Sequence, residues 1–275
     1  GSAVPDHVGL GDLVVQGRGS AYWEYSNNPG GWTRSRCNSD NNRWRTTILT
    51  GVLGETNLVF DTVTIRDYAS LGVGTNVTLR FNTLTCVSNQ VNMLTLYGGT
   101  LVLKEPTHLT NMNLRAFRAG SRIEFENGVV EKTLTIGANC EFAVDYPCTL
   151  AGNLVVTNGG SVRHTMQNWT NTTYHVELQI DGDLHVAPTS RVDANGCGWA
   201  DANAPGPGYP SIGYRAGSHG GLAEDAGTAV CYGSIRRPVL SGSGNRSASI
   251  NVGGGVIRLN VDGTSTIDGT VSANG

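Results

Sequence analysis

A short unit that recurs along the chain limits what this sequence can fold into. Each copy places alternating apolar residues on both sides of a turn that contains glycine. The copies are "LGVGTNVTLRF" from Leu71, "LYGGTLVLKE" from Leu96, "FRAGSRIEFE" from Phe117, "TIGANCEFAV" from Thr135 and "VTNGGSVRH" from Val156. Their turn glycines, Gly74, Gly99, Gly120, Gly137 and Gly160, are spaced by 25, 21, 17 and 23 residues. Units of this length, with period-2 strands and no amphipathic helix, are typical of the stacked coils of a β-solenoid.

The sequence therefore predicts an all-β protein, a right-handed parallel β-helix, since parallel β crossovers are almost always right-handed. We expect an N-terminal cap over residues 1–50 and a β-helix over residues 51–275, interrupted by a Gly-rich insertion from about 196 to 254. The strand period places one set of side chains in the core: Val77, Leu79, Phe81, Ile123 and Phe125. The alternative is an antiparallel β-sandwich, which also has short strands separated by frequent turns.

Charge and hydropathy exclude two classes of partner. The 275 residues carry a formal net charge of -3, only 15% of them are charged, and no run of Lys and Arg occurs. We therefore expect no nucleic-acid partner, because phosphate binding requires a basic stripe. No segment approaches the roughly 18 to 20 consecutive apolar residues that a membrane-spanning helix needs, so we expect no membrane span.

The C-terminal part, from Asp193 to Gly275, carries a series of Gly-rich phrases. They are "VDANGCGW", "GPGY…GSHGG", "YGSIRRPVLSGSG" and "NVGGGVIRLNVDGTSTIDGTVSANG". This part resembles a Gly-rich parallel β-helix element of large extracellular and cell-surface proteins, in which G-x-[IV]-x-A-N-G phrases accompany a GSHGG loop. The earlier coils are similar, in general terms, to the pectate-lyase-like β-helix superfamily. The resemblance implies a secreted or surface β-helix linked to polysaccharides or adhesion, with no particular activity.

Two further features favour an extracellular location. N-x-S/T sequons occur at Asn76, Asn168, Asn171 and Asn245, and the six cysteines form an even set without CxxC spacing. We expect the pairs Cys140 with Cys148, Cys197 with Cys231, and Cys37 with Cys86. The phrase Ala-Asn-Gly ends the chain at 273–275 and also precedes the insertion at 194–196. This repetition predicts that further domains of the same longer chain are partners.

Two stretches could carry catalytic chemistry. Asp181, Asp183 and His185 alternate in "DGDLH" and would share one strand face, with Asp193 on the following strand. Such a cluster would suit a polysaccharide hydrolase or lyase. However, Asp-Gly recurs at 262–263 and 268–269 and is also a turn signal.

The loop "GSHGG" contains Ser218 and His219, and His219 is a further catalytic candidate. Adjacent residues of an extended segment point to opposite sides, and no G-x-S-x-G elbow is present, so a conformational role is favoured. We expect no cofactor and no metal site, with Ca²⁺ at Glu224 and Asp225 as the alternative.

Aromatic residues are the candidates for glycan binding, because sugar rings stack on aromatic faces. Many lie near arginines in the N-terminal region, where the alternative is that they cap the open end of the solenoid. The candidates are Trp23, Tyr25, Trp32, Trp44, Trp199, Tyr209 and Tyr214.

The sequence thus favours an extracellular or cell-surface module, structural or adhesive, that binds a polysaccharide or a cell-surface glycan. The alternative is a polysaccharide lyase or glycoside hydrolase on the same scaffold. The module is preferred because Lys104 and Lys132 are the only lysines and no cluster of basic residues and carboxylates on successive coils is apparent.

Overall fold

The computed structural model describes residues 8–9, 11–16, 46–50, 56–66, 69–86, 92–167, 174–199, 233–234, 236, 239–243 and 252–275. Within these ranges the secondary structure consists of strands and turns, and every strand pairing is parallel. The predicted all-β class and the parallel strand arrangement are therefore confirmed, and the sandwich alternative is wrong. No helix in this part of the chain has the length and apolar character needed to cross a membrane.

The strands form three sheets, here named A, B and C. Sheet A contains β1 (Val8–Gly9), β2 (Leu13–Gln16), β4 (Asn57–Arg66), β6 (Thr78–Cys86), β8 (Thr100–Leu103), β11 (Ser121–Phe125), β14 (Cys148–Leu150), β17 (Val176–Ile180) and β20 (Ile257–Val261). Sheet B contains β3 (Thr46–Leu49), β5 (Ser70–Val73), β7 (Asn92–Tyr97), β10 (Met112–Arg118), β13 (Glu141–Val144), β16 (Ser161–Arg163), β19 (Arg191–Asp193) and β22 (Thr270–Ser272). Sheet C contains β9 (Thr107–Leu109), β12 (Thr133–Ile136), β15 (Asn153–Val156), β18 (Leu184–Val186) and β21 (Ser265–Ile267).

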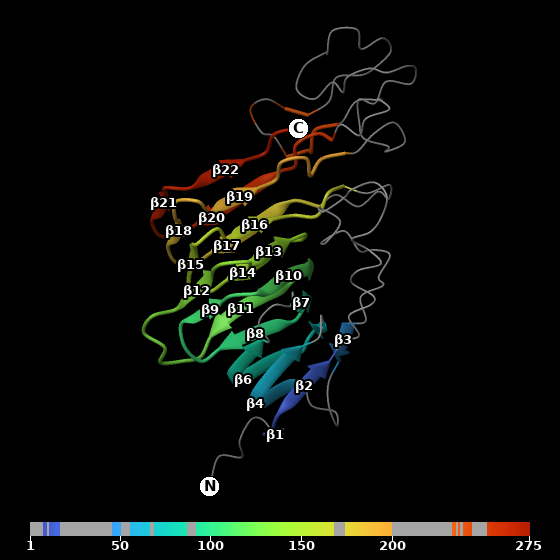
Figure 1. The fold of residues 1–275 in the computed structure, drawn as a ribbon, viewed down its shortest axis with the longest axis vertical. Coiled ribbons are helices and arrows are strands. Elements are labelled where there is room, and N and C mark those ends of the chain that lie inside the picture. The colour runs from blue at the N-terminus through green and yellow to red at the C-terminus, as the bar shows by residue number, and fades with distance from the viewer. Residues whose placement is uncertain are drawn as a thin grey trace.

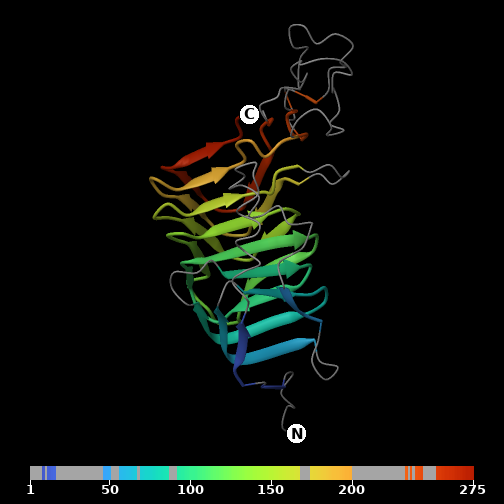
Figure 2. The ribbon, with the colours of Figure 1, turned by 45° about the vertical axis from the view of Figure 1, so that its right-hand side comes forward.

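From β8 onward the chain visits sheets A, C and B in turn, and each such circuit is one coil. The coils stack into an elongated body with the chain termini at opposite ends (Figure 1). The same stacking is visible after a 45° turn (Figure 2). Strands β1, β2 and β3 come from the range expected to be a cap but pair within sheets A and B. Residues 17–45 lie outside the described part.

The coils differ in length, as one register row through sheet A shows. Asn57, Thr78, Thr100, Arg122, Thr149, Gln179 and Asn260 are successive partners, which gives coil lengths of 21, 22, 22, 27, 30 and 81 residues. The last and longest coil contains the Gly-rich insertion. The extra residues lie at the corners, because the strands themselves must keep their pairing from coil to coil.

The core is a single cluster that extends through the stack. Val77, Leu79, Phe81, Ile123 and Phe125 are all buried in it, which confirms the predicted inward set. Because side chains alternate along a strand, the same period places polar residues on the outer faces of the sheets. The outer faces are therefore where binding groups can gather.

The five turn glycines do not occupy one equivalent position, although the repeat suggested that they do. Gly74, Gly99 and Gly120 lie at the corner between sheets B and A, whereas Gly137 and Gly160 lie between sheets C and B. A Cβ atom at Gly160 would lie 2.3 Å from the Ile136 carbonyl oxygen of the previous coil. A Cβ atom at Gly99, in the other corner, would lie 2.4 Å from the Gly74 carbonyl oxygen, so these two positions require glycine because the backbones of stacked turns approach closely.

The described residues at the two ends of the Gly-rich insertion pair with the stack, and we call them the base of the insertion. Trp199 forms parallel bridges with Gln167 on one side and Ser243 on the other. The Trp199 N–H donates to the Gly242 carbonyl (2.9 Å), and the Gly253 N–H donates to the Trp199 carbonyl (3.2 Å). The described ends of the insertion therefore continue the coil-to-coil stacking of the body.

Candidate functional site

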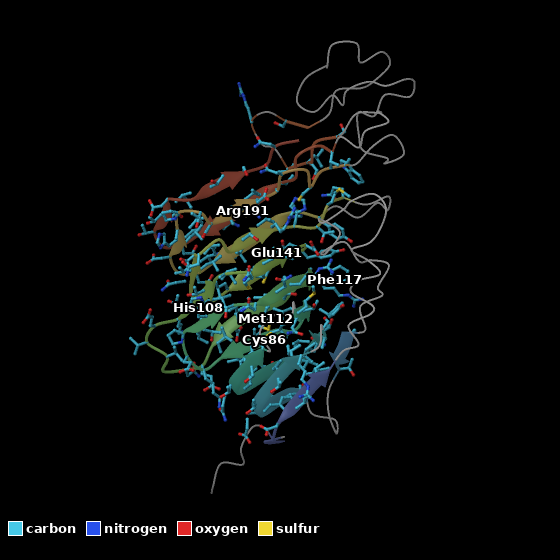
Figure 3. All side chains as sticks on the ribbon, viewed as in Figure 1. Cys86, His108, Met112, Phe117, Glu141 and Arg191 are labelled. Atoms are coloured by element: carbon cyan, nitrogen blue, oxygen red, sulfur yellow. The ribbon has the colours of Figure 1, made fainter. Side chains whose placement is uncertain are left out.

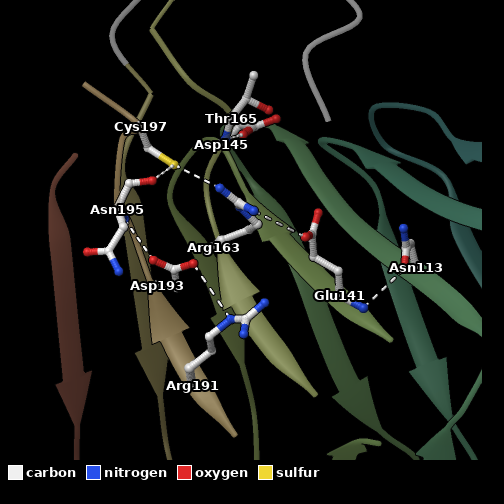
Figure 4. A network of polar contacts seen from close by, with 9 residues as sticks. All are labelled: Asn113, Glu141, Asp145, Arg163, Thr165, Arg191, Asp193, Asn195 and Cys197. Carbon is white, nitrogen blue, oxygen red and sulfur yellow. Dashed lines mark hydrogen bonds and ion pairs between the residues drawn. The ribbon is translucent and has the colours of Figure 1, made fainter. Parts of the chain in front are cut away.

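The outer face of sheet B holds buried polar side chains on several neighbouring strands. In β10 the inward positions are Met112, Leu114 and Ala116, so Asn113 and Arg115 point outward, yet both are buried. The register continues the Arg115 row through Ala143 to Arg163 and Asp193. We call the set Asn113, Arg115, Glu141, Arg163, Arg191 and Asp193 the sheet B cluster. Figure 4 shows all of its members except Arg115.

A buried ion pair joins three coils beside this cluster. Arg115 contacts the Asp145 carboxylate at 2.6 Å, and both side chains are almost fully buried. The other carboxylate oxygen accepts a hydrogen bond from the Thr165 backbone N–H at 2.7 Å. The Arg115 guanidinium also lies 4.1 Å from the centre of the Phe117 ring. Asp145 is therefore satisfied within the protein and links β10, β13 and the segment after β16.

A second group of charges is partly open to solvent. Arg163 lies 3.8 Å from the Glu141 carboxylate and donates to the Cys197 sulfur at 3.1 Å. Asp193 accepts a hydrogen bond from the Asn195 backbone N–H at 2.8 Å and lies 3.6 Å from Arg191. The Arg191 side chain is 54% exposed. These contacts place donors and acceptors side by side along one face (Figure 4).

Four aromatic rings form a ladder at the end of sheet B where the chain turns toward sheet A. Tyr97, Phe117, Tyr146 and Tyr174 meet edge to face, with successive ring centres 5.4, 6.3 and 5.8 Å apart. Tyr174 is buried and the other three are half-buried. Figure 3 places Phe117 and His108, which belongs to sheet C, on opposite sides of the stack. The ladder therefore borders the sheet B cluster and not the other outer faces.

His164 fixes the base of the insertion to the coil below it. Its Nε2 atom accepts a hydrogen bond from the Val256 backbone N–H (3.2 Å), so Nδ1 carries the proton and donates to the Thr165 carbonyl (2.7 Å). Burial lowers the pKa of His164 to about 4, although Thr165 and Asp145 oppose this shift. The neutral imidazole is thus the form that holds Val256, directly before β20.

The predicted carboxylate group is not assembled as expected. Asp181 and Asp183 lie in the turn between β17 and β18, whereas His185 lies in β18, so the expected alternation of the three along one strand is not found. Asp183 accepts a hydrogen bond from the Thr264 backbone N–H at 2.7 Å, and His185 lies 3.3 Å from Asp268. The prediction that Asp-Gly marks a turn is confirmed for this stretch, because Asp181 and Gly182 lie at the bend between β17 and β18. Asp193 is on sheet B, in the sheet B cluster.

Most of the aromatic candidates lie outside the described residues, as do Ser218, His219, Glu224 and Asp225. The aromatic candidates concerned are Trp23, Tyr25, Trp32, Trp44, Tyr209 and Tyr214. Trp199 is described, forms backbone bridges with Gln167 and Ser243, and is only 5% exposed. Its ring therefore cannot provide an open sugar-stacking face.

The expected disulfide between Cys140 and Cys148 is absent, since both are free thiols. Cys140 precedes β13 in sheet B and its sulfur contacts the Met112 carbonyl, whereas Cys148 begins β14 in sheet A. Each side chain packs separately into the core, so residue spacing alone was misleading. Cys86 is also a free thiol. The expected partners Cys37 and Cys231 lie outside the described ranges.

Sequence reasoning missed the sheet B cluster, whose members lie far apart in the chain. Arg115 and Asp145 are separated by 30 residues, and Arg115 and Thr165 by 50. The available signal was the alignment of "NLRAF", "EFAVDY", "SVRHT" and "RVDAN" on successive coils. In the described part of the chain, no group of three or more His, Cys, Asp or Glu residues could hold a metal ion.

Comparison with known proteins adds no relative: neither a protein-family model, nor a curated protein, nor a solved structure matches the chain. Functional argument therefore rests on the geometry of the sheet B cluster.

Proposed function

We propose that the protein is a rigid β-helix module of an extracellular or cell-surface protein that binds a glycan through the sheet B cluster. The finer fold in this proposal is a right-handed parallel β-helix, which the general preference of parallel β crossovers supports. The exposed sequon Asn76, in a turn with φ of 63°, and the Gly-rich phrases support the extracellular assignment. Further domains of a longer chain would be joined by this module.

One observation carries the glycan proposal, namely the mixture of hydrogen-bonding groups on one face. Two guanidinium groups and two carboxylates reach the surface there, those of Arg163 and Arg191 and those of Glu141 and Asp193, beside the buried pair of Arg115 and Asp145. Their formal charges cancel, so net charge does not select a polyanion. Sugar hydroxyl groups both donate and accept hydrogen bonds, and therefore suit a face that offers both.

The aromatic ladder supplies the apolar part of such a surface. Half-buried rings of Tyr97, Phe117 and Tyr146 stand on successive coils beside the cluster. Successive strands lie about 4.8 Å apart, so equivalent groups recur at a constant step along the stack. A polymer with a repeating unit can therefore contact several coils at once, which increases affinity without any single strong contact.

A panel of neutral and uronic-acid polysaccharides tests this proposal by measuring retardation in affinity electrophoresis. We expect binding to at least one polymer, and the double variant Arg191→Ala/Asp193→Asn should weaken it at least about tenfold, or about 1.4 kcal/mol. The matched control is Arg258→Ala/Glu177→Gln, which removes an ion pair of 3.2 Å from the outer face of sheet A. Equal loss in both variants, or no binding to any polymer, would contradict the proposal.

A polysaccharide lyase or glycoside hydrolase is the second candidate, favoured by one observation. Glu141 and Asp193 are partly exposed carboxylates on strands that flank Arg163. Paired acids and a nearby cation are what sugar hydrolysis or β-elimination requires. Reducing-sugar release and the absorbance of unsaturated products separate this candidate from the module. Turnover that disappears in Glu141→Gln with an unchanged melting temperature would replace binding by catalysis as the function.

A further inference from the structure

The corner between β11 and β12 is longer than the corresponding corners of the coils around it. It contains seven residues, 126–132, whereas the corners from β8 to β9 and from β14 to β15 contain three and two. The Glu126 N–H still donates to the preceding coil at 2.9 Å. Asn127 and Gly128, both exposed, then form the centre of a turn, which the Val129 N–H closes on the Glu126 carbonyl at 3.3 Å. This turn therefore projects beyond the coil-to-coil pairing.

The peptide between Asn127 and Gly128 is open to solvent. A Cβ atom built at Gly128 would have no heavy atom within 4 Å, and its φ of 92° suits the third position of a type II turn. Within the described part of the chain, neither the Asn127 side chain nor the Gly128 N–H has a hydrogen-bond partner. The side-chain amide and the following backbone nitrogen are thus free to approach each other.

An Asn-Gly pair with this freedom can react with itself, because glycine has no side chain that shields its nitrogen. The Gly128 nitrogen attacks the side-chain carbonyl carbon Cγ of Asn127, and its proton passes through water to the amide nitrogen that leaves as ammonia. The product is a five-membered succinimide ring. Water then opens the ring at either carbonyl carbon, which gives aspartate or, with one extra main-chain carbon, isoaspartate.

Two other internal Asn-Gly pairs, Asn158–Gly159 and Asn195–Gly196, are held by the neighbouring coil. In the first pair the glycine N–H donates to the Ser190 hydroxyl at 3.2 Å. In the second the glycine N–H donates to the Asn274 carbonyl at 2.7 Å, and both polar atoms of the asparagine side chain are also hydrogen-bonded. Reaction at either pair requires these contacts to open first, which costs free energy.

We propose that Asn127 is a modification site, at which spontaneous deamidation of the folded protein is much faster than at the other two pairs. The extra main-chain carbon of isoaspartate lies in the projecting turn, so the pairings of β11 with β14 and of β12 with β15 are kept. Deamidation also adds a negative charge next to Glu126 and near Glu131. Aged protein is therefore folded but more acidic at this corner.

Peptide mass spectrometry of the folded chain, incubated at pH 8 and sampled over weeks, tests this inference. Trypsin releases the three pairs in separate peptides, 123–132, 133–163 and 192–215. We expect deamidation in 123–132 to be at least about tenfold faster than in the others, since an opening cost of about 1.4 kcal/mol slows a reaction tenfold. Methyl transfer by an isoaspartyl methyltransferase identifies the isoaspartate product. Equal rates in the three peptides of the folded chain would overturn the proposal.

The chain unfolded in guanidinium chloride is the control, in which the three pairs should react at similar rates because the coil contacts are lost. A preference for Asn127 that persists there would overturn the proposal, since it would come from local sequence. Ser190→Ala removes the hydroxyl that binds the Gly159 N–H, and should accelerate deamidation at Asn158 but not at Asn127. No acceleration at Asn158 would contradict the protection that the proposal assigns to coil contacts.

Discussion

Inward-facing apolar residues differ in burial between the first and the last coils of the described solenoid. At the first coils Val15, Leu49 and Leu58 are buried, whereas at the last coil Ile267 and Val271 are almost half exposed. All of these side chains have the apolar character expected of the interior. Among the described residues, Ile267 and Val271 lie on the last strands of sheets C and B and pack only against the preceding coil.

Polar contacts also differ in burial between the middle of the stack and its C-terminal end. The Arg115–Asp145 pair is buried and supported by Thr165, while Arg191 next to Asp193 is half exposed. The contribution of a contact to stability should therefore depend on its burial as much as on its chemistry. The following predictions test that dependence, from the largest expected effect to the smallest.

Asp145→Ala should reduce the free energy of unfolding by about 3 to 5 kcal/mol, because it leaves Arg115 buried without this carboxylate. Asp193→Ala removes one backbone hydrogen bond and a partly exposed ion pair, and should cost only about 1 kcal/mol. Urea unfolding followed by circular dichroism measures both. Adding Arg115→Met to Asp145→Ala should recover part of the loss. Equal costs for the two aspartates would break the contrast between middle and end.

Ile136 and Ile267 form a matched pair, because both occupy one inward row of sheet C. Ile136 is fully buried, so Ile136→Ala should cost about 2 to 5 kcal/mol through lost burial and the cavity left behind. Ile267→Ala should cost less than about 1 kcal/mol, because Ile267 is 43% exposed and loses little burial. A penalty at Ile267 as large as that at Ile136 would contradict this difference in burial.

The strand period in the sequence was sufficient for the parallel fold and the core. Leu79 and Ile123, among others, were assigned inward from alternation alone, which depends only on local geometry. The sequence did not show how the repeated copies align with one another in the structure. Gly137 and Gly160 occupy a different corner from Gly74, because corner lengths vary and alignment by turn glycines cannot distinguish the corners.

The variation in corner length also explains why the sequence did not predict the candidate site. Arg115, Asp145 and Thr165 meet only once the coils are superposed in sheet B, where Arg115 pairs with Ala143 after 28 residues and Ala143 with Arg163 after 20, and no local pattern contains those lengths. Local spacing was also misleading for Asp181, Asp183 and Cys140. These residues lie next to corners. At a corner the chain passes from one sheet to the next, so residues close in sequence need not lie on the same face.

At acid pH, protonation of His164 should destabilise the C-terminal end of the stack. Its pKa is about 4 in the folded chain and about 6.5 when exposed, so the unfolded state binds more protons between these values. Stability should therefore fall as the pH decreases from about 6.5 to 4, by about 3 kcal/mol in total, and this contribution should change no further below pH 4. Urea unfolding at a series of pH values measures the slope.

His164→Gln should lose most of this pH dependence, whereas His108→Gln, at an exposed position of sheet C, should retain it. Hydrogen exchange locates the effect. At pH 5 the amides of β20 should exchange faster relative to those of β6, because Val256 loses its acceptor when the imidazole is protonated. A uniform increase along the stack would show that His164 does not act on the insertion base in particular.

The reactivity of the free thiols reports how well the middle coils of the stack are packed. Burial raises the pKa of Cys148 to about 12 and that of Cys140 to about 12, and it also raises the pKa of the half-buried Cys86. Because the thiolate is the reactive form, iodoacetamide at pH 8 should alkylate Cys86 of the folded protein first, and Cys140 and Cys148 only after unfolding. Peptide mass spectrometry of samples quenched at intervals gives the order, and labelling in urea provides the control in which all three should react at similar rates. A Cys140–Cys148 disulfide in the unreduced protein, or labelling of Cys148 before Cys86, would mean that the middle coils separate more readily than their burial indicates.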